Sequence, residues 1–146
     1  MSNQGNVTSI YPVLMTDRVA QTAGFYREHF DFEETFSADW YVSLRHRSRP
    51  EFELAVLRFD HPTIPAGFGA PSRGLLINIE VEDAKAARAR LVGEAGLPEV
   101  QPLREESFGQ RHFILRDPSG NLVDVIENIP PSEDYASSYA DGAANG

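Results

Sequence analysis

The sequence predicts an α+β protein made of two copies of a βαβββ module. Asp17 and Asp83 each follow a strand-like stretch and precede a helical one, and the offset 83 − 17 = 66 also relates Glu33 to Glu99. Residues 61–73, rich in proline and glycine, separate the copies, and a strand–turn–strand pattern ends the second. Because neither copy has enough apolar residues for its own core, we expect a curled mixed sheet around a cleft.

The first module is expected over residues 7–60. It begins with a strand from Val7 to Thr16, followed by a helix from Asp17 to Phe30 whose apolar residues share one face. The side chain of Asp17 is suited to the N-cap of that helix. Short segments rich in aromatic and aliphatic residues then predict three antiparallel strands, at 33–37, 40–45 and 52–59.

The second module is expected over residues 74–128, after a linker at 61–73 whose prolines and glycines exclude a continued helix or central strand. Asp83 is the predicted N-cap of its helix. The predicted elements are a strand at 75–81, a helix at 83–95 and strands at 100–105, 111–116 and 122–127. Residues 129–146 are polar and small, which predicts a flexible C-terminal tail.

The most specific local pattern is the turn Asp117-Pro118-Ser119-Gly120-Asn121 between two apolar strands. The fixed φ of Pro118 suits the second position of a type I turn, Gly120 supplies a positive φ, and Asp117 can accept from the turn's own amides. An EF-hand is excluded because Leu122 stands at the sixth position, which needs glycine. The segment therefore predicts a β-hairpin.

Composition excludes several classes of function. The formal net charge is −9, with no clustered lysine and arginine large enough to offset it, so nucleic acid and anionic membranes are not expected partners. The absence of cysteine excludes disulfides, thiolate zinc sites and cysteine nucleophiles. No apolar run reaches transmembrane length and no signal-peptide pattern opens the chain, so a cytoplasmic protein is expected.

Aromatic and amide side chains on the predicted strands indicate a pocket for a small planar or apolar organic molecule. Asn78 shares a strand face with Leu76 and Glu80 and can present its amide to the interior. Phe52 is more consistent with the core. The expected ligand-binding residues of this kind are Tyr11, Trp40, Tyr41, Asn78 and Phe108.

His112 and Asp124 complete the expected ligand-binding set. If Phe113 points into the core, His112 takes the opposite face of its strand and reaches either the cleft or solvent. Asp124 alternates with Val123 and Val125, and a buried carboxylate there needs a partner or a raised pKa. No HExxH, Walker-type, dinucleotide-binding or Ser-His-Asp pattern is present, so catalytic residues are not assigned.

Three segments together resemble the vicinal oxygen chelate superfamily, which includes glyoxalase I, extradiol dioxygenases, fosfomycin-modifying enzymes and bleomycin-binding resistance proteins. They are Phe25-Tyr26-Arg27-Glu28-His29-Phe30-Asp31-Phe32, Phe108-Gly109-Gln110-Arg111-His112-Phe113 and the turn at 117–121. The resemblance covers about residues 7 to 128 and implies a glyoxalase/bleomycin-resistance-like fold. It implies little about chemistry, because members share a scaffold and differ in their sites.

Enzymes of this superfamily hold one divalent metal, with ligands from the first and last strand of each module. The matching first-strand positions are Ile10 and Leu76, which have no donor atoms, and a shift of one residue offers only the phenol of Tyr11. The remaining positions fall near Glu53 and on Asp124, although Glu53 alternates with Phe52 and Leu54 and can equally face solvent. Two oxygen ligands would bind a metal weakly.

We therefore expect a metal-free protein that binds a small organic molecule in an aromatic-lined cleft, of the resistance or sequestration type, without a cofactor. Its resemblance to the binding branch of the superfamily implies a homodimer. The alternative is a lyase, isomerase or dioxygenase of the same superfamily that holds one divalent metal ion through Glu53 and Asp124. The identity of the ligand does not follow from the sequence.

Overall fold

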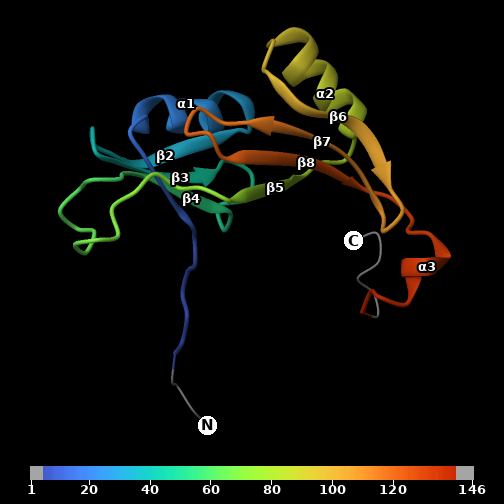
Figure 1. Cartoon of the computed structure of the whole chain (residues 1–146), viewed down its shortest axis with the longest axis horizontal. Helices are drawn as coiled ribbons and strands as arrows, with labels where there is room; N and C mark the ends of the chain where they lie inside the picture. The colour runs from blue at the N-terminus through green and yellow to red at the C-terminus, as the bar shows by residue number, and fades with distance from the viewer. Residues whose placement is uncertain (1–4, 141–146) are drawn as a thin grey trace. The chain divides into compact units, whose positions relative to one another are not determined.

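A computed structural model describes residues 5–140 of the chain, which forms two compact units that divide between Arg73 and Gly74. The chain is an α+β protein with two βαβββ-type modules, each built on a mixed four-stranded sheet (Figure 1). The first unit contains β1 (Val13–Thr16), α1 (Val19–His29), β2 (Phe32–Ser37), β3 (Tyr41–His46) and β4 (Glu53–Arg58).

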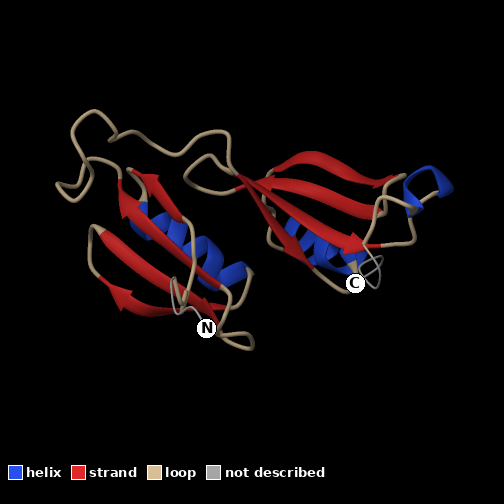
Figure 2. Ribbon diagram, turned by 90° about the horizontal axis from the view of Figure 1, so that it is seen from below, coloured by secondary structure: helices blue, strands red, loops and turns tan. Residues whose placement is uncertain are grey.

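The sheet of the first unit has the strand order β1-β4-β3-β2, with β1 parallel to β4 and the other pairs antiparallel. Helix α1 packs against β2, β3 and β4 and covers one face of this sheet (Figure 2). The residues between helix and sheet alternate along each strand with residues of the opposite face. They include the fully buried Leu14, Tyr26, Leu44 and Val56.

The second unit repeats this arrangement with the order β5-β8-β7-β6, in which β5 is parallel to β8. Helix α2 packs against β6, β7 and β8, and the fully buried Leu91, Phe113, Leu115, Val123 and Val125 form the core. The elements are β5 (Leu76–Glu80), α2 (Ala84–Arg88), a π-helix η1 (Ala89–Glu94), β6 (Glu99–Glu106), β7 (Gln110–Arg116), β8 (Leu122–Asn128) and α3 (Glu133–Ala136).

The first strand and helix start later than predicted. Strand β1 begins at Val13, because Pro12 has no N–H to donate, although its carbonyl accepts from Ala55 N at 3.0 Å. Helix α1 begins at Val19, so the predicted N-cap Asp17 is wrong and Arg18 occupies that position without a side-chain cap. The structure places Asp17 in the bend before the helix.

The second helix confirms its predicted cap but changes its geometry. The Asp83 side chain accepts from Ala86 N at 3.0 Å. Beyond Arg88 the chain continues as the π-helix η1, and Ala95 N donates to Arg90 O, five residues back, at 2.9 Å. The predicted single helix is therefore two segments of different pitch.

The predicted hairpin between β7 and β8 is confirmed. Asp117 Oδ1 accepts from Ser119 N at 2.9 Å and from Asn121 N at 3.0 Å, and Gly120 has a φ of 90°. Asp117 and Asn121 are both buried, so these bonds satisfy groups that water does not reach.

The segment after β8 contains the short helix α3, which the sequence did not predict. Ile129 N donates to Gly109 O at 3.0 Å, and the Tyr139 hydroxyl donates to Phe108 O, so this segment is bonded to the turn between β6 and β7. Gly109 has a φ of 114°, and a Cβ there would lie 2.9 Å from Ile129 O, so glycine is required. Residues 141–146 lie outside the described part.

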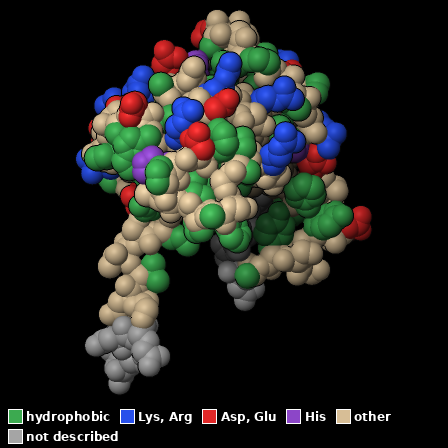
Figure 3. Space-filling model, turned by 60° about the vertical axis from the view of Figure 1, so that its left-hand side comes forward, with side chains coloured by type: hydrophobic (Ala, Val, Ile, Leu, Met, Phe, Trp, Pro, Cys, Tyr) green, Lys and Arg blue, Asp and Glu red, His purple; other side chains and the backbone are tan. Residues whose placement is uncertain are grey.

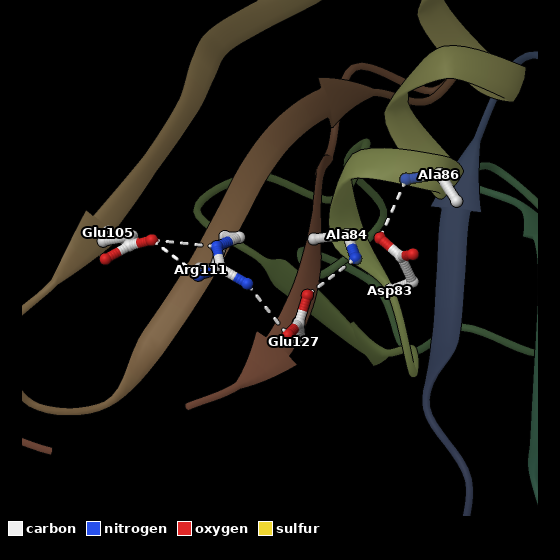
Figure 4. A network of polar contacts seen from close by, with 6 residues as sticks. All are labelled: Asp83, Ala84, Ala86, Glu105, Arg111 and Glu127. Carbon is white, nitrogen blue, oxygen red and sulfur yellow. Dashed lines mark hydrogen bonds and ion pairs between the residues drawn. The ribbon is translucent and has the colours of Figure 1, made fainter. Parts of the chain in front are cut away.

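A polar network joins α2 to the sheet of the second unit (Figure 4). Glu127 of β8 accepts from Ala84 N at 3.0 Å and from Arg111 Nη1 at 3.0 Å, while Arg111 Nη2 donates to Glu105 at 2.7 Å. These contacts fix the start of the helix over the end of the sheet. Within residues 5–140, no helix has the length and apolar character needed to cross a membrane.

Candidate functional site

The open face of the second sheet, the face turned away from α2, carries a buried polar cluster. Leu122, Asp124 and Ile126 of β8 point to this face, because they alternate with the core residues Val123 and Val125. Register places their partners on β7 and β5 on the same face. This confirms the alternation predicted for Asp124 and places the candidate site on the open face.

His112 of β7 lies at the centre of the cluster and bonds two carboxylates. Its Nδ1 lies 2.7 Å from Asp124 Oδ1 and its Nε2 lies 2.8 Å from Glu106 Oε2. His112 is 6% exposed and Asp124 is 5% exposed. Of the two options left open by the sequence, the cleft or solvent, free solvent does not apply because His112 is buried, and Asp124 has the partner that its burial requires.

Arg104 extends the cluster along β6. Its Nε donates to Glu106 Oε2 at 2.5 Å, so His112 and Arg104 both donate to the same oxygen of Glu106. Strand β6 pairs only with β7, and its residues Arg104 and Glu106 are opposite His112 and Gln110. The cluster therefore runs from the central strand β8 to the edge strand β6.

Two pKa values reflect this arrangement. Burial alone would lower the pKa of His112, but the hydrogen bonds to Glu106 and Asp124 and their charges outweigh it, so the pKa is raised above 6.5. The pKa of Glu106 is lowered below 4.5, first by the hydrogen bond from His112 and then by that from Arg104. An imidazolium donates from both ring nitrogens, as this geometry requires of ionised carboxylates.

Most side chains around the cluster on the same face are neutral, and the charged Glu80 and Arg116 lie toward the ends of this face, opposite Ile126 and Leu122. Asn78 of β5 is opposite Asp124 and is exposed, while Leu76 is opposite Leu122. Ile114 is opposite Asp124 and Ile126 is opposite His112. The open face of the second unit thus combines a charged cluster with an apolar surround.

The open face of the first sheet carries aromatic and hydroxyl groups beside apolar residues such as Ala55 and Leu57. A hydrogen bond to Tyr41 is the largest of the causes that raise the pKa of Tyr11 above 10.0. Phe36 contacts Tyr41 with 6.1 Å between ring centroids. Glu53 accepts a hydrogen bond from Ser9 Oγ at 2.5 Å. Tyr11, Tyr41 and Glu53 thus lie on one surface.

Trp40 lies beside Tyr41, with 5.7 Å between the ring centroids, and Phe108 belongs to the second unit. Trp40 stacks on His61, with ring centroids 3.9 Å apart and planes 9° from parallel. Phe108 lies in the turn between β6 and β7 and contacts Tyr135 edge-on at 6.2 Å. Phe52, expected in the core, is 51% exposed because it precedes β4 at the end of the sheet.

Several basic side chains of the first unit are paired with acidic ones. Arg45 Nε lies 2.9 Å from Glu33 Oε2, and Arg27 Nη1 lies 2.6 Å from Glu34 Oε2. In the face shown in Figure 3, Lys and Arg side chains are interspersed with Asp and Glu. Such exposed pairs contribute little to stability, and this surface offers no concentration of one sign of charge.

The residues do not fit the divalent metal site that the resemblance implies. Ile10 is 87% exposed and Leu76 has no donor atom. The strand register makes Ala55 of β4 the equivalent of Asp124 of β8, because Val13 of β1 is opposite Ala55 as Asn78 of β5 is opposite Asp124. Glu53 lies two residues before Ala55, on the same face of β4.

Within residues 5–140, no three His, Asp or Glu side chains are grouped so as to hold a metal ion. In the cluster of Glu106, His112 and Asp124, both imidazole nitrogens already bond carboxylates, so the three cannot converge on one cation.

Glu106 and Arg104 are the residues that the sequence analysis missed. The hairpin register contains the needed signal, since Glu106 pairs with Gln110 beside the turn and Arg104 then falls opposite His112. The register shifts of β6 lie farther from the turn, between Glu99 and Arg104, and Glu106 lies one residue beyond the strand predicted at 100–105.

The chain has recognisable relatives at the level of family and fold. The model of the Glyoxalase/Bleomycin resistance protein/Dioxygenase superfamily matches residues 9–125. No curated protein sequence matches the chain.

Three solved structures illustrate the likeness. A lactoylglutathione lyase from Agrobacterium tumefaciens has a TM-score of 0.63 and 18% identity, covering 82% of this chain and 93% of that one. A glyoxalase-related enzyme from Fulvimarina pelagi has a TM-score of 0.65 and 19% identity, covering 82% and 88%. The bleomycin-binding protein of Streptomyces verticillus, in complex with copper(II)-bleomycin, has a TM-score of 0.55 and 23% identity, covering 82% and 94%. At such identities the likeness establishes a shared fold.

Proposed function

Because the chain belongs to the glyoxalase/bleomycin resistance protein/dioxygenase superfamily, we propose that it binds a small organic molecule on the open faces of its sheets without a resident metal ion. This is a sequestration or resistance type of function. It needs no cofactor and no turnover.

The observation that carries the proposal is the hydrogen bond between His112 and Asp124. Asp124 stands where metal-holding members of the superfamily place a ligand from the last strand, and here its carboxylate bonds an imidazole at 2.7 Å. A buried carboxylate needs a positive or hydrogen-bonding partner, and His112 supplies it in place of a metal. Leu76, at the first-strand position of the same unit, offers no ligand.

The open face of the first unit supports the organic nature of the ligand. Tyr11 and Tyr41 present rings and hydroxyls, and Phe36 is 51% exposed. Rings of this kind stack on planar molecules, and hydroxyls orient polar substituents. Exposed aromatic groups on a sheet face are more typical of a binding surface than of a solvent-facing one.

Metal analysis and ligand binding together test the proposal. We expect the purified chain, dialysed against manganese, nickel, iron or magnesium salts, to retain far less than stoichiometric metal. Planar organic molecules should bind in EDTA, as measured by thermal shift and by the fluorescence of Trp40, the single tryptophan. Asp124→Asn and Glu53→Gln should leave the metal content unchanged.

The opposite result is equally clear. Stoichiometric metal that is lost in Asp124→Asn or Glu53→Gln, with ligand binding that disappears in EDTA, would replace this proposal by the divalent-metal-dependent lyase, isomerase or dioxygenase.

The homodimer implied by the resemblance is a separate part of the proposal. Sedimentation equilibrium should give twice the chain mass, and a monomer at working concentration would contradict it.

A further inference from the structure

We propose that the ligand of the second unit carries a carboxylate or similar oxyanion, which binds His112 Nε2 and Arg104 Nε in place of the Glu106 side chain. This inference rests on the proposed function and names the chemical class of its ligand. Glu106 is then an internal stand-in for the ligand's anionic group.

The donor geometry is that of an oxyanion site. His112 Nε2 and Arg104 Nε lie 2.8 Å and 2.5 Å from one oxygen, Glu106 Oε2. Two N–H donors that converge on one charged acceptor are the arrangement by which proteins bind carboxylates and developing oxyanions. A ligand oxygen placed where Oε2 lies would receive the same two bonds.

Glu106 is the exchangeable member of the cluster and Asp124 the fixed one. The Asp124 side chain is 7% exposed and belongs to β8, which has a strand on each side. The Glu106 side chain is 20% exposed and stands at the last residue of the edge strand β6. Asp124 therefore holds the imidazole through Nδ1, and Nε2 is left for a partner that can be replaced.

Charge balance favours an anionic ligand over a neutral one. Within the cluster, Asp124 and Glu106 carry two negative charges and His112 and Arg104 two positive ones, while Glu80 and Arg116, of opposite sign, lie farther along the same face. If Glu106 turns to solvent, one net positive charge remains on a partly buried surface, and an incoming carboxylate restores neutrality. The raised pKa of His112 supports this, because it keeps the ring protonated at both nitrogens over a wider pH range.

The apolar side chains next to the cluster favour an apolar body for the ligand. Ile114, Ile126, Leu122 and Leu76 lie on the same face, and Leu76 is 47% exposed. The side-chain amide nitrogen of Gln101, opposite Ile114, is buried and has no hydrogen-bond partner among residues 5–140. The ligand class is thus a small apolar monocarboxylate, for which Gln101 offers one further donor.

Benzoate and its neutral analogue benzamide test the inference in matched variants. Glu106→Ala removes the internal carboxylate, and Glu105→Ala removes the same charge from the opposite face of β6, where Glu105 bonds Arg111. Affinities follow from calorimetry, and the His112 ring resonances in NMR spectra report where the ligand binds. Far-UV circular dichroism checks that each variant is folded.

We expect benzoate to bind Glu106→Ala at least about tenfold more tightly than the unmodified chain and to shift the His112 resonances, because the internal competitor is gone. Benzamide affinity should be unchanged by Glu106→Ala, and Glu105→Ala should resemble the unmodified chain. In the Glu106→Ala background, Arg104→Gln should weaken benzoate binding, and since the Arg104 side chain is 59% exposed, this variant should fold.

Three results would overturn the inference. If benzoate and benzamide bind equally to every variant, or if benzoate fails to bind while neutral molecules shift the open-face resonances, the ligand is not an oxyanion and the proposed function stands. If no molecule of a chemically mixed panel binds to any variant, the proposed function fails together with the inference.

Discussion

The two sheets place different residues at equivalent positions of their open faces. Register equates His112 with Tyr41, since each is opposite an apolar residue of the central strand, Ile126 in one unit and Leu57 in the other. The same register equates Asp124 with Ala55. One module thus holds a buried charged pair where the other holds a phenol and a methyl group, which shows that the βαβββ scaffold fixes positions and not chemistry.

Burying the charged pair of His112 and Asp124 costs desolvation free energy in the second unit, which the first unit, with Tyr41 and Ala55, does not incur. Removing two charges from water costs several kcal/mol per ion in effective terms, and their attraction repays this only when geometry and further hydrogen bonds are good. The first unit demonstrates that the fold accepts uncharged residues at these positions. The charged pair of the second unit is therefore better explained by binding than by folding.

The largest expected effect comes from breaking the buried pair on one side. Asp124→Ala should lower the free energy of unfolding by about 2 kcal/mol, because His112 Nδ1 is left buried without its acceptor while Glu106 still bonds Nε2. Glu53→Ala, which removes an exposed carboxylate bonded to Ser9, should cost at most about 0.5 kcal/mol. Urea unfolding followed by far-UV circular dichroism measures both, and Trp40 fluorescence follows the first unit separately.

Transplanting the first unit's residues sharpens this result. The double variant His112→Tyr/Asp124→Ala places Tyr41 and Ala55 equivalents in the second sheet and leaves no unpaired charge. It should be more stable than Asp124→Ala alone. Equal costs for Asp124→Ala and Glu53→Ala would instead mean that the charged pair contributes no more than a surface contact.

Stability of the second unit should also depend on pH. The pKa of His112 is raised in the folded state, so its contribution is complete below about 6.5 and is lost as pH rises through the folded value. The pKa of Glu106 is lowered, so its contribution is complete above about 4.5 and is lost as pH falls through the folded value. The cluster should therefore contribute most to the free energy of unfolding between about pH 4.5 and pH 6.5.

Urea unfolding measured across pH 4 to 9 gives the free energy of unfolding at each pH. His112→Gln is the control, because it should remove the loss of stability as pH rises above about 6.5. Charged groups facing His112 are Asp124, Glu106 and Arg104, with Glu80 opposite Ile126 on the same face. A profile that is flat near neutral pH in the unmodified chain would contradict the raised pKa of His112.

The sequence predicts the fold far better than the site, and particular residues show why. The turn at Asp117 and the cap at Asp83 are local interactions within a few residues, so composition and spacing suffice to predict them. The contact of His112 with Glu106 depends on the pairing of two strands, and Glu106 lies one residue beyond the strand predicted at 100–105. Sequence spacing also made Glu53 the first-unit equivalent of Asp124, whereas the strand register makes Ala55 the equivalent, two residues later on the same face.

The smallest expected effect separates the two helix starts, which the sequence repeat treats as equal. Asp83→Ala removes the hydrogen bond from Ala86 N and should lower the free energy of unfolding by up to about 1 kcal/mol. The loss is reduced by the remaining hydrogen bond from Ala84 N to Glu127, which still satisfies one amide of the helix start. Asp17→Ala should change stability by no more than about 0.3 kcal/mol, because Arg18 and not Asp17 precedes the first helical residue. Thermal unfolding of the two single variants gives the comparison directly. Equal losses would show that Asp17 caps α1 after all, and that the two modules begin their helices in the same way despite the difference at Arg18.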